Sequence, residues 1–179
     1  MANSVGMIEL NSIARGIEVA DYMLKAAQVD VLRATTVCPG KYIIVIGGET
    51  SAVEASMKEG LKRSGSHAVD TLHIPNINEQ VIPAIYMSNP VQTLEAVGVV
   101  EFFSIASAII AADVAAKAAN ITLIEVRMGL AIGGKGVVTL TGDVGAVRAA
   151  VAAVEEATEF MVGNTIIPRP SPKLLESLL

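Results

Sequence analysis

The residues with the clearest capacity for chemistry form one short turn around the chain's single cysteine. Cys38 lies in the run Thr36-Val37-Cys38-Pro39-Gly40-Lys41. One cysteine excludes an intrachain disulfide and fits a reducing compartment. Pro39 and Gly40 predict a tight turn that can come close to a symmetry axis. From these residues alone, a small buried hydrophobic side chain is the favoured interpretation of Cys38, with a ligand site as the alternative.

Other polar side chains offer no coherent catalytic group. His67 and His73 lie near or in a predicted strand, without a cysteine or carboxylate at metal-ligand spacing, so a surface or packing role is expected. No serine stands in a nucleophile-elbow context. The glycines of segment 133–136 lie between two predicted strands rather than before a helix, which excludes a P-loop. We therefore expect no catalytic residue, and a protein that is not an enzyme.

The cysteine turn belongs to the first half of an internal repeat in the sequence. Residues 5–10 (VGMIEL) correspond to residues 97–102 (VGVVEF), at an offset of 92 residues. The same offset relates Lys25-Ala26-Ala27 to Lys117-Ala118-Ala119, and Gly40-Lys41 then matches Gly134-Lys135 at an offset of 94. So many matches in register indicate two copies of one domain.

Each copy predicts the same order of elements. The first has a strand over 5–10, a helix capped by Ser12, two strands joined by the Cys38 turn, a helix over about 51–64 and a strand over 69–74. One apolar stripe follows the first helix: Ile13, Ile17, Ala20, Leu24 and Ala27. The predicted fold class is α+β, with two tandem ferredoxin-like (βαββαβ) domains over 1–90 and 91–179.

Composition narrows the function classes. The net charge is -5 and no Lys/Arg run is present, which argues against nucleic acid as a partner. No apolar stretch reaches transmembrane length and no secretory signal opens the sequence, so a cytoplasmic protein without a membrane is expected. Hydrophobic residues make up 52% of the chain and charged residues 17%, which suggests that part of the surface is buried between subunits.

Several of these runs resemble the bacterial microcompartment shell family. They are Gly6-Met7-Ile8-Glu9, Ala20-Asp21, Lys25-Ala26-Ala27, residues 142–147 (GDVGAV) and Ile167-Pro168-Arg169-Pro170. The resemblance covers nearly the whole chain and is to the tandem-domain trimeric class. It implies a homotrimer that forms a flat pseudo-hexagonal tile in a shell, edge-to-edge assembly with other shell proteins, and a central pore.

The turn of residues 36–41 resembles that of the tandem shell proteins of propanediol-utilisation compartments. The resemblance implies one [4Fe-4S] cluster per trimer, ligated by Cys38 of three chains, with a non-protein fourth ligand. Val37, Pro39, Gly40 and Lys41 would then line the pore, and Lys41 would offset the charge of the cluster. An interior or cytosolic redox protein is the further partner that this implies. The second copy has Ile132-Gly133-Gly134-Lys135 at this place, without a ligand side chain.

The same resemblance assigns Lys25, Lys117 and Arg169 to tile–tile contacts. Each lysine follows an aspartate by four residues, so an ordinary solvated ion pair is the alternative. Asn76 stands where the first copy would need an arginine after Pro75.

Four functions stay open at this point. They are a shell tile with a redox cluster for electron transfer, a shell tile with a metabolite-conducting pore, a ligand-binding ferredoxin-like module, and a small enzyme. The module lacks a binding motif, and the enzyme lacks an acid, base or nucleophile group.

Overall fold

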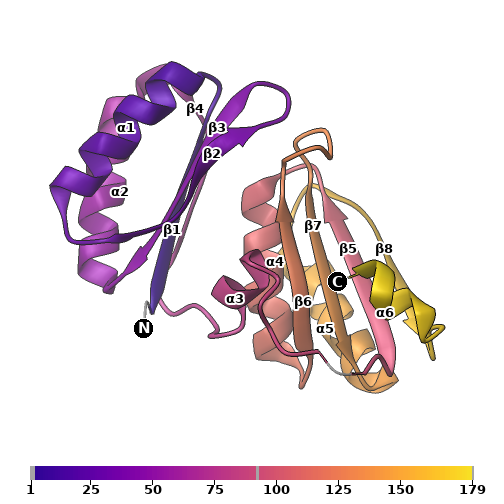
Figure 1. Cartoon of the computed structure of the whole chain (residues 1–179). Helices are drawn as coiled ribbons and strands as arrows, with labels where there is room; N and C mark the ends of the chain where they lie inside the picture. Colours follow the sequence, from indigo (N-terminus) through magenta and orange to yellow (C-terminus); the bar gives the residue numbers. More distant parts are fainter. Residues whose placement is uncertain (1–2, 92, 179) are drawn as a thin grey trace. The chain divides into compact units, whose positions relative to one another are not determined.

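The computed structural model describes residues 3–91 and 93–178. The chain folds into two compact units, Met1–Ile77 and Asn78–Leu179 (Figure 1). The boundary lies earlier than the predicted one after residue 90. The reason is that the segment after Ile77 makes its hydrogen bonds with the second unit, through Asn78 and Gln80.

Unit 1 is a four-stranded antiparallel sheet with two helices on one face (Figure 1). Its elements follow the predicted order: β1 (Ser4–Leu10), α1 (Ile13–Ala26), β2 (Asp30–Val37), β3 (Lys41–Gly48), α2 (Thr50–Ser64) and β4 (Ala68–Ile74). The strand order is β2-β3-β1-β4, which leaves β2 and β4 at the edges. The predicted ferredoxin-like α+β fold is confirmed for this unit.

The core of unit 1 lies between the sheet and the two helices. It consists of Ile8, Leu10, Val19, Met23, Ile44, Ile46, Val53 and Met57. Ser12 caps α1 as predicted, because its side chain accepts a hydrogen bond from the Arg15 N–H. A Cβ on Gly16 would lie 2.6 Å from the side chain of Tyr42, so glycine is needed for α1 to approach β3 closely.

Unit 2 repeats this architecture. After a short helix α3 (Val81–Ile85), it contains β5 (Ala96–Phe102), α4 (Ile105–Ala118), β6 (Thr122–Met128), β7 (Gly136–Gly142), α5 (Val144–Ala157), β8 (Met161–Pro168) and α6 (Lys173–Leu178). The strand order is β6-β7-β5-β8. Ser104 and Asp143 cap α4 and α5. The predicted repeat is thus confirmed element by element.

The predicted apolar stripe differs between the two copies. In α1, Ile17 and Leu24 are 56% and 42% exposed, and the buried face carries Gly16, Val19 and Met23 instead. In α4, the counterpart Ile109 is fully buried. The repeat therefore conserves the fold but leaves an apolar face of α1 uncovered in this chain.

Among the residues that the structure describes, no helix combines the length and the apolar character needed to cross a bilayer.

Candidate functional site

Cys38 lies at the tip of the hairpin between β2 and β3. Val37 pairs with Lys41 across the hairpin, and residues 38–40 form the loop. The Gly40 N–H donates to the Val37 carbonyl over 3.0 Å, and the Cys38–Pro39 peptide bond is cis. Gly40 has a φ of 85°, a left-handed conformation that favours glycine. Cys38 is half-buried while Pro39 and Gly40 are exposed, so the cysteine lies at the end of the hairpin and outside the core.

The predicted pore-loop residues therefore lie together. Val37, Pro39, Gly40 and Lys41 all flank Cys38 on this one hairpin. Lys41, however, has a partner in its own chain, because its ammonium forms an ion pair with the carboxylate of Glu9 on β1. Glu9 is only 2% exposed. The charge of Lys41 is thus largely neutralised at the base of the turn, and less of it acts on Cys38 than an unpaired lysine would supply.

The equivalent loop of unit 2 is longer and has no thiol. It covers residues 129–135 between Met128 and Gly136, which pair with each other. Gly129, Ala131, Gly133 and Gly134 all have positive φ angles. Lys135 pairs with Glu101 over 2.8 Å, which repeats the pair of Lys41 with Glu9. The two copies therefore share the ion pair that anchors the loop and differ in the loop itself.

The predicted tile-edge residues lie at separate places. Lys25, in the last turn of α1, is 72% exposed and pairs with Asp21 over 2.5 Å. The hydrogen bond and the negative charge of Asp21 raise the pKa of Lys25. Lys117, in the last turn of α4, pairs with Asp113 over 2.6 Å. Arg169 follows β8, with a φ of 50° and its N–H bonded to the Glu95 carbonyl.

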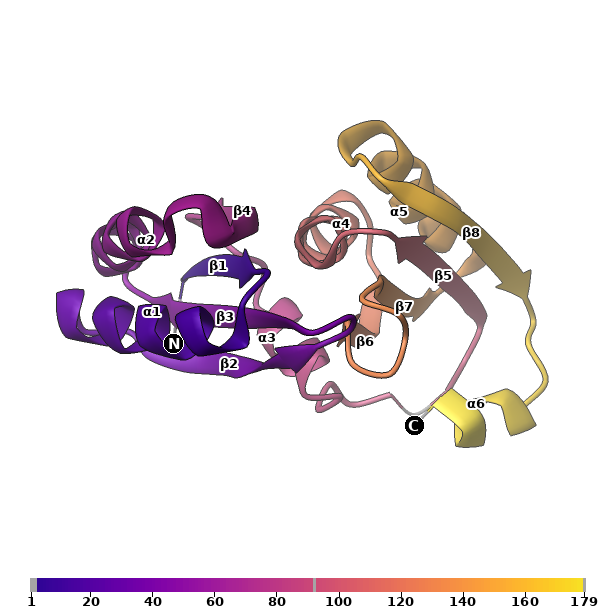
Figure 2. The ribbon, with the colours of Figure 1, turned by 90° about the horizontal axis from the view of Figure 1, so that it is seen from above.

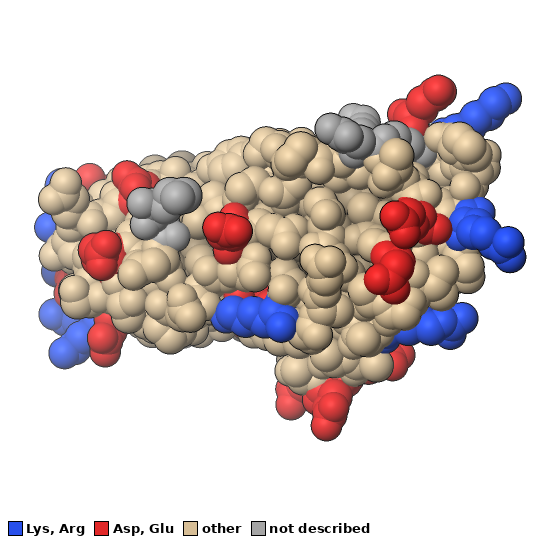
Figure 3. Space-filling view, turned by 90° about the horizontal axis from the view of Figure 1, so that it is seen from below, with Lys and Arg blue, Asp and Glu red and all other residues tan. Residues whose placement is uncertain are grey.

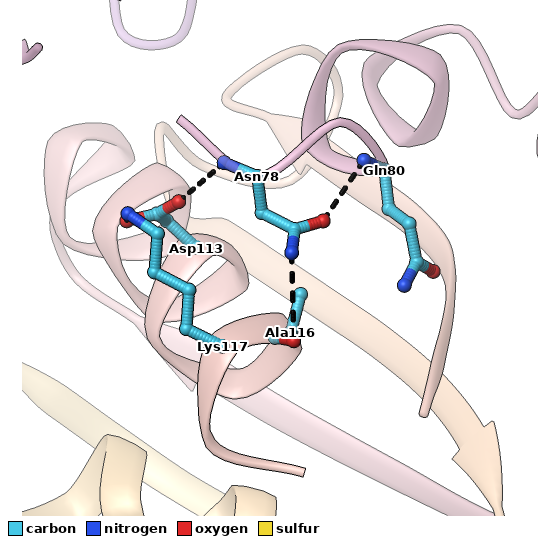
Figure 4. Close-up of polar contacts among 5 residues, drawn as sticks. All are labelled: Asn78, Gln80, Asp113, Ala116 and Lys117. Atoms are coloured by element: carbon cyan, nitrogen blue, oxygen red, sulfur yellow. Dashed lines mark hydrogen bonds and ion pairs between the residues drawn. The ribbon is translucent and has the colours of Figure 1, made fainter. Parts of the chain in front are cut away.

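Sequence reasoning missed the role of Asp113. Unlike the exposed Asp21, Asp113 is only 7% exposed, and it accepts the Asn78 N–H over 2.7 Å as well as the Lys117 ammonium (Figure 4). The Asn78 side chain bonds the Ala116 carbonyl and the Gln80 N–H (Figure 4). The amide residues Asn78 and Gln80, just after Ile77, are the signal that could have predicted a docked connector, which we define as residues 78–90.

The two histidines have structural partners, as expected. The ring of His67 bonds the Asn11 side chain over 2.9 Å, and the ring of His73 bonds the Ser4 hydroxyl over 3.1 Å. Within residues 3–91 and 93–178, no group of three or more His, Cys, Asp or Glu side chains is arranged to hold a metal ion. On the face drawn in Figure 3, acidic and basic side chains are scattered over a mostly uncharged surface. This face thus has no continuous basic patch of the kind that nucleic acid requires.

Two copies of a ferredoxin-like domain, each with a lysine-anchored loop between its second and third strands, define a tandem-repeat protein. Residues 4–77 and 96–170 each match the BMC domain, and the chain belongs to this family of microcompartment shell proteins. The two matches cover each unit's full set of strands, from β1 to β4 and from β5 to β8.

Similar proteins are known from several bacteria. The bacterial microcompartment shell protein PduT of Citrobacter freundii is 41% identical over 182 residues, which cover 100% of this chain and 99% of the relative. The crystal structure of a microcompartment protein from Desulfitobacterium hafniense DCB is 46% identical, with a TM-score of 0.90 over 98% of this chain and 99% of that one. The carboxysome shell protein CcmK1 of Thermosynechococcus vestitus is 35% identical and covers 54% of this chain and 92% of its own length. The chain is thus a two-domain shell protein similar to PduT.

Proposed function

We propose that three copies of this chain form a pseudo-hexagonal shell tile, and that Cys38 of the three chains holds one [4Fe-4S] cluster at its central pore. Threefold symmetry brings one residue of each chain to a shared axis. The observation that carries the proposal is the placement of the only cysteine at the tip of a hairpin.

The donor set fits this group. Iron–sulfur clusters are held by cysteine thiolates, of which three copies supply three. Cys38 is half-buried rather than enclosed in the core, which supports contact with a group outside its own chain. The tight turn at Gly40 also leaves open space beside its backbone, since a Cβ there would meet no atom within 4 Å. The fourth iron would take a non-protein ligand, such as water or a small thiol.

The divergence of the two copies supports the same assignment. The loop of residues 129–135 carries no cysteine, so each trimer would hold three thiols and not six. When bound, the cluster supplies one-electron chemistry, which would serve electron transfer between the two sides of the shell. The part of this chain is to hold the thiols in position, through the hairpin and the pair of Lys41 with Glu9. This is a structural and redox role without catalysis, in a shell within the cytoplasm.

Edge-to-edge assembly completes the proposed tile. Lys25 is strongly exposed near the end of α1, and Arg169 is exposed after β8. Long cationic side chains at such positions can reach backbone carbonyls or carboxylates of an adjacent tile. We assign Lys25, Lys117 and Arg169 to contacts with other shell proteins on this basis.

The test is anaerobic purification of the full chain, with iron and sulfide analysis, electron paramagnetic resonance and sedimentation velocity. We expect a trimer with about four iron and four sulfide ions per three chains. Cys38→Ala should give a trimer without iron. Thr36→Ala, a change on the same hairpin that removes no thiol, should keep the cluster. A colourless, iron-free trimer after reconstitution, or a cluster that persists in Cys38→Ala, would refute the cluster and leave a tile with a metabolite-conducting pore.

A further inference from the structure

The segment after β4 and the segment after β8 are equivalent in the repeat. Val5 pairs with Ile74 in unit 1, and the corresponding Val97 pairs with Ile167 in unit 2. Each of these strand ends is followed by proline, Pro75 or Pro168. Counted from these prolines, Ser171 corresponds to Asn78, Lys173 to Gln80, and Leu174 to Val81. Helix α6 is therefore the counterpart of α3.

The connector docks on the unit that follows it. Helix α3 packs against β6 and α4. Its apolar residues Val81, Ala84 and Ile85 are all buried. Burial of three aliphatic side chains supplies a hydrophobic contribution to this contact.

Amide side chains of the connector also cover the outer edge of β6. The Gln80 amide donates to the Ile121 carbonyl and accepts the Leu123 N–H, each over 3.0 Å. Asn89 donates to the Leu123 carbonyl over 2.9 Å. Because β6 is an edge strand, these bonds satisfy backbone groups that a neighbouring strand would otherwise pair. The connector thus closes the α4–β6 side of unit 2.

The equivalent side of unit 1 carries exposed apolar side chains. Strand β2 is also an edge strand, and Val31 on it corresponds to Leu123, since both precede the same register shift. Val31 is 45% exposed whereas Leu123 is fully buried. Ile17 and Leu24 on α1 are exposed as well. We call Ile17, Leu24 and Val31, with the β2 edge, the α1–β2 face.

Helix α6 has leucines at the positions, 174 and 178, that correspond to Val81 and Ile85 of α3. Its sequence is Lys-Leu-Leu-Glu-Ser-Leu, with Lys173 and Glu176 exposed. Figure 2 shows it at the end of the segment that leads away from β8. A leucine-bearing helix after β8 and an exposed apolar face of unit 1 thus stand, in the repeat, at the two positions that the connector joins in unit 2.

We propose that α6 of one chain docks on the α1–β2 face of a second copy, as α3 docks on α4 and β6. In this arrangement the Ser171 N–H takes the place of the Asn78 N–H and donates to Asp21 of the second copy, the counterpart of Asp113. Leu174 takes the place of Val81. The inference rests on the proposed assembly of several chains, and it names the segment that links one chain to the next.

One residue should make the proposed contact of α6 with the α1–β2 face weaker than the contact of α3 with unit 2. Gln80 both donates to and accepts from the β6 edge, whereas its counterpart Lys173 can only donate. Lys173 can therefore satisfy the carbonyl of Val29, the counterpart of Ile121, but not the Val31 N–H. Lys173→Gln should restore the second bond and tighten the contact.

Hydrogen exchange of the full-length protein, followed by mass spectrometry, tests the docking. In the wild-type assembly, peptides from α1 and β2 should exchange slowly. Leu174→Asp should accelerate this exchange by about tenfold or more, and Lys173→Gln should slow it. Peptides from β6 should not change in either variant, because the connector still covers them. Glu176→Gln, on the same helix, is the matched control and should behave as the wild type.

The outcomes separate this inference from the proposed function. A trimer by sedimentation in which Leu174→Asp leaves α1 and β2 unchanged would overturn the docking and leave the tile intact. A wild-type monomer with rapid exchange in α1 and β2 would overturn both. A mixture of Val31→Cys chains and Lys173→Cys chains, each also carrying Cys38→Ala, adds a direct readout. A short bismaleimide should link the two kinds of chain, whereas failure to link them in the trimer would count against the docking.

Discussion

Lys41, the residue that closes the Cys38 turn, forms an ion pair with the buried carboxylate of Glu9. Lys135 forms the equivalent pair with Glu101 in the second copy, but there both side chains are more than one-third exposed. The same contact is therefore retained in two different environments. In the first copy it ties the base of the cysteine-bearing hairpin to the central strand β1.

This difference in burial predicts different costs for the same substitution. Glu9→Gln leaves Lys41, whose side chain is 24% exposed, without its charged partner, and should lower the free energy of unfolding by about 3 kcal/mol, the lower end of the range for a buried pair. Glu101→Gln breaks a solvated pair and should cost less than about 1 kcal/mol. Urea denaturation of both variants at one protein concentration measures the two values. Equal losses would show that burial of Glu9 does not govern the pair.

Asp113 and Asp21 provide a second matched comparison. Asp113→Ala leaves the partly buried Asn78 N–H without its acceptor, which should lower the free energy of unfolding by about 1–2 kcal/mol. It should also make the connector more sensitive to limited proteolysis. Within its own chain Asp21 makes only an exposed ion pair, so Asp21→Ala should cost less than about 1 kcal/mol and should leave the connector resistant to proteolysis. A connector that stays resistant to proteolysis in Asp113→Ala would contradict the role of this carboxylate.

Much of the fold follows from local patterns in the sequence. The repeat, the order of the elements, the cap at Ser12 and the hairpin around Cys38 depend on short-range spacing, and each can be read without knowledge of distant contacts. The environment of the α1 stripe could not be predicted in this way. Helical periodicity shows that Ile17 and Leu24 share a face, but it does not show which face packs on the sheet. Gly16 decides that question, since it lets α1 approach Tyr42.

The amide residues of the connector suggest that it docks, but the place where it docks could not be predicted from the sequence, for a related physical reason. Its position depends on hydrogen bonds from Asn78 and Gln80 to backbone and side-chain groups between 35 and 43 residues away. Amide side chains of this kind can bond any exposed backbone group, so their presence alone selects no partner. The ion pairs of Lys41 with Glu9 and of Lys135 with Glu101 are easier to predict from the sequence. Both members of each pair stand at equivalent positions of the repeat.

Glu59 provides a pH-dependent test within unit 1. The Arg63 guanidinium bonds its carboxylate over 2.6 Å and holds the pKa of Glu59 below its ordinary value, with a smaller effect from Lys62. Arg63 also lies over the ring of Tyr22 on α1, 4.1 Å from its centroid. Because the folded pKa is the lower one, the stabilisation by Glu59 is complete above the unfolded pKa and is lost as the pH falls through the folded pKa.

The corresponding prediction is a shift in one carboxyl titration. Arg63→Ala should raise the pKa of Glu59 towards its ordinary value, as followed by NMR of the side-chain carboxyl carbon. Lys62→Ala should raise it less, because the Lys62 ammonium lies 3.8 Å from the Glu59 carboxylate, beyond hydrogen-bond distance. A larger shift in Lys62→Ala than in Arg63→Ala would contradict this ranking.

If Lys25, Lys117 and Arg169 contact neighbouring tiles, their substitution should affect array formation without affecting trimer formation. Lys25→Ala combined with Lys117→Ala should leave soluble trimers but abolish two-dimensional arrays, since both ammonium groups are exposed near the ends of their helices. Arg169→Ala should weaken the arrays as well. Asn76→Ala changes the equivalent position of the first copy and is the matched control, because asparagine lacks the charge and reach of arginine. Electron microscopy of concentrated protein, with sedimentation of the same samples, distinguishes the two levels of assembly. Arrays that persist in the double lysine variant would refute the edge assignment, whereas loss of the trimer itself would place these lysines within the tile.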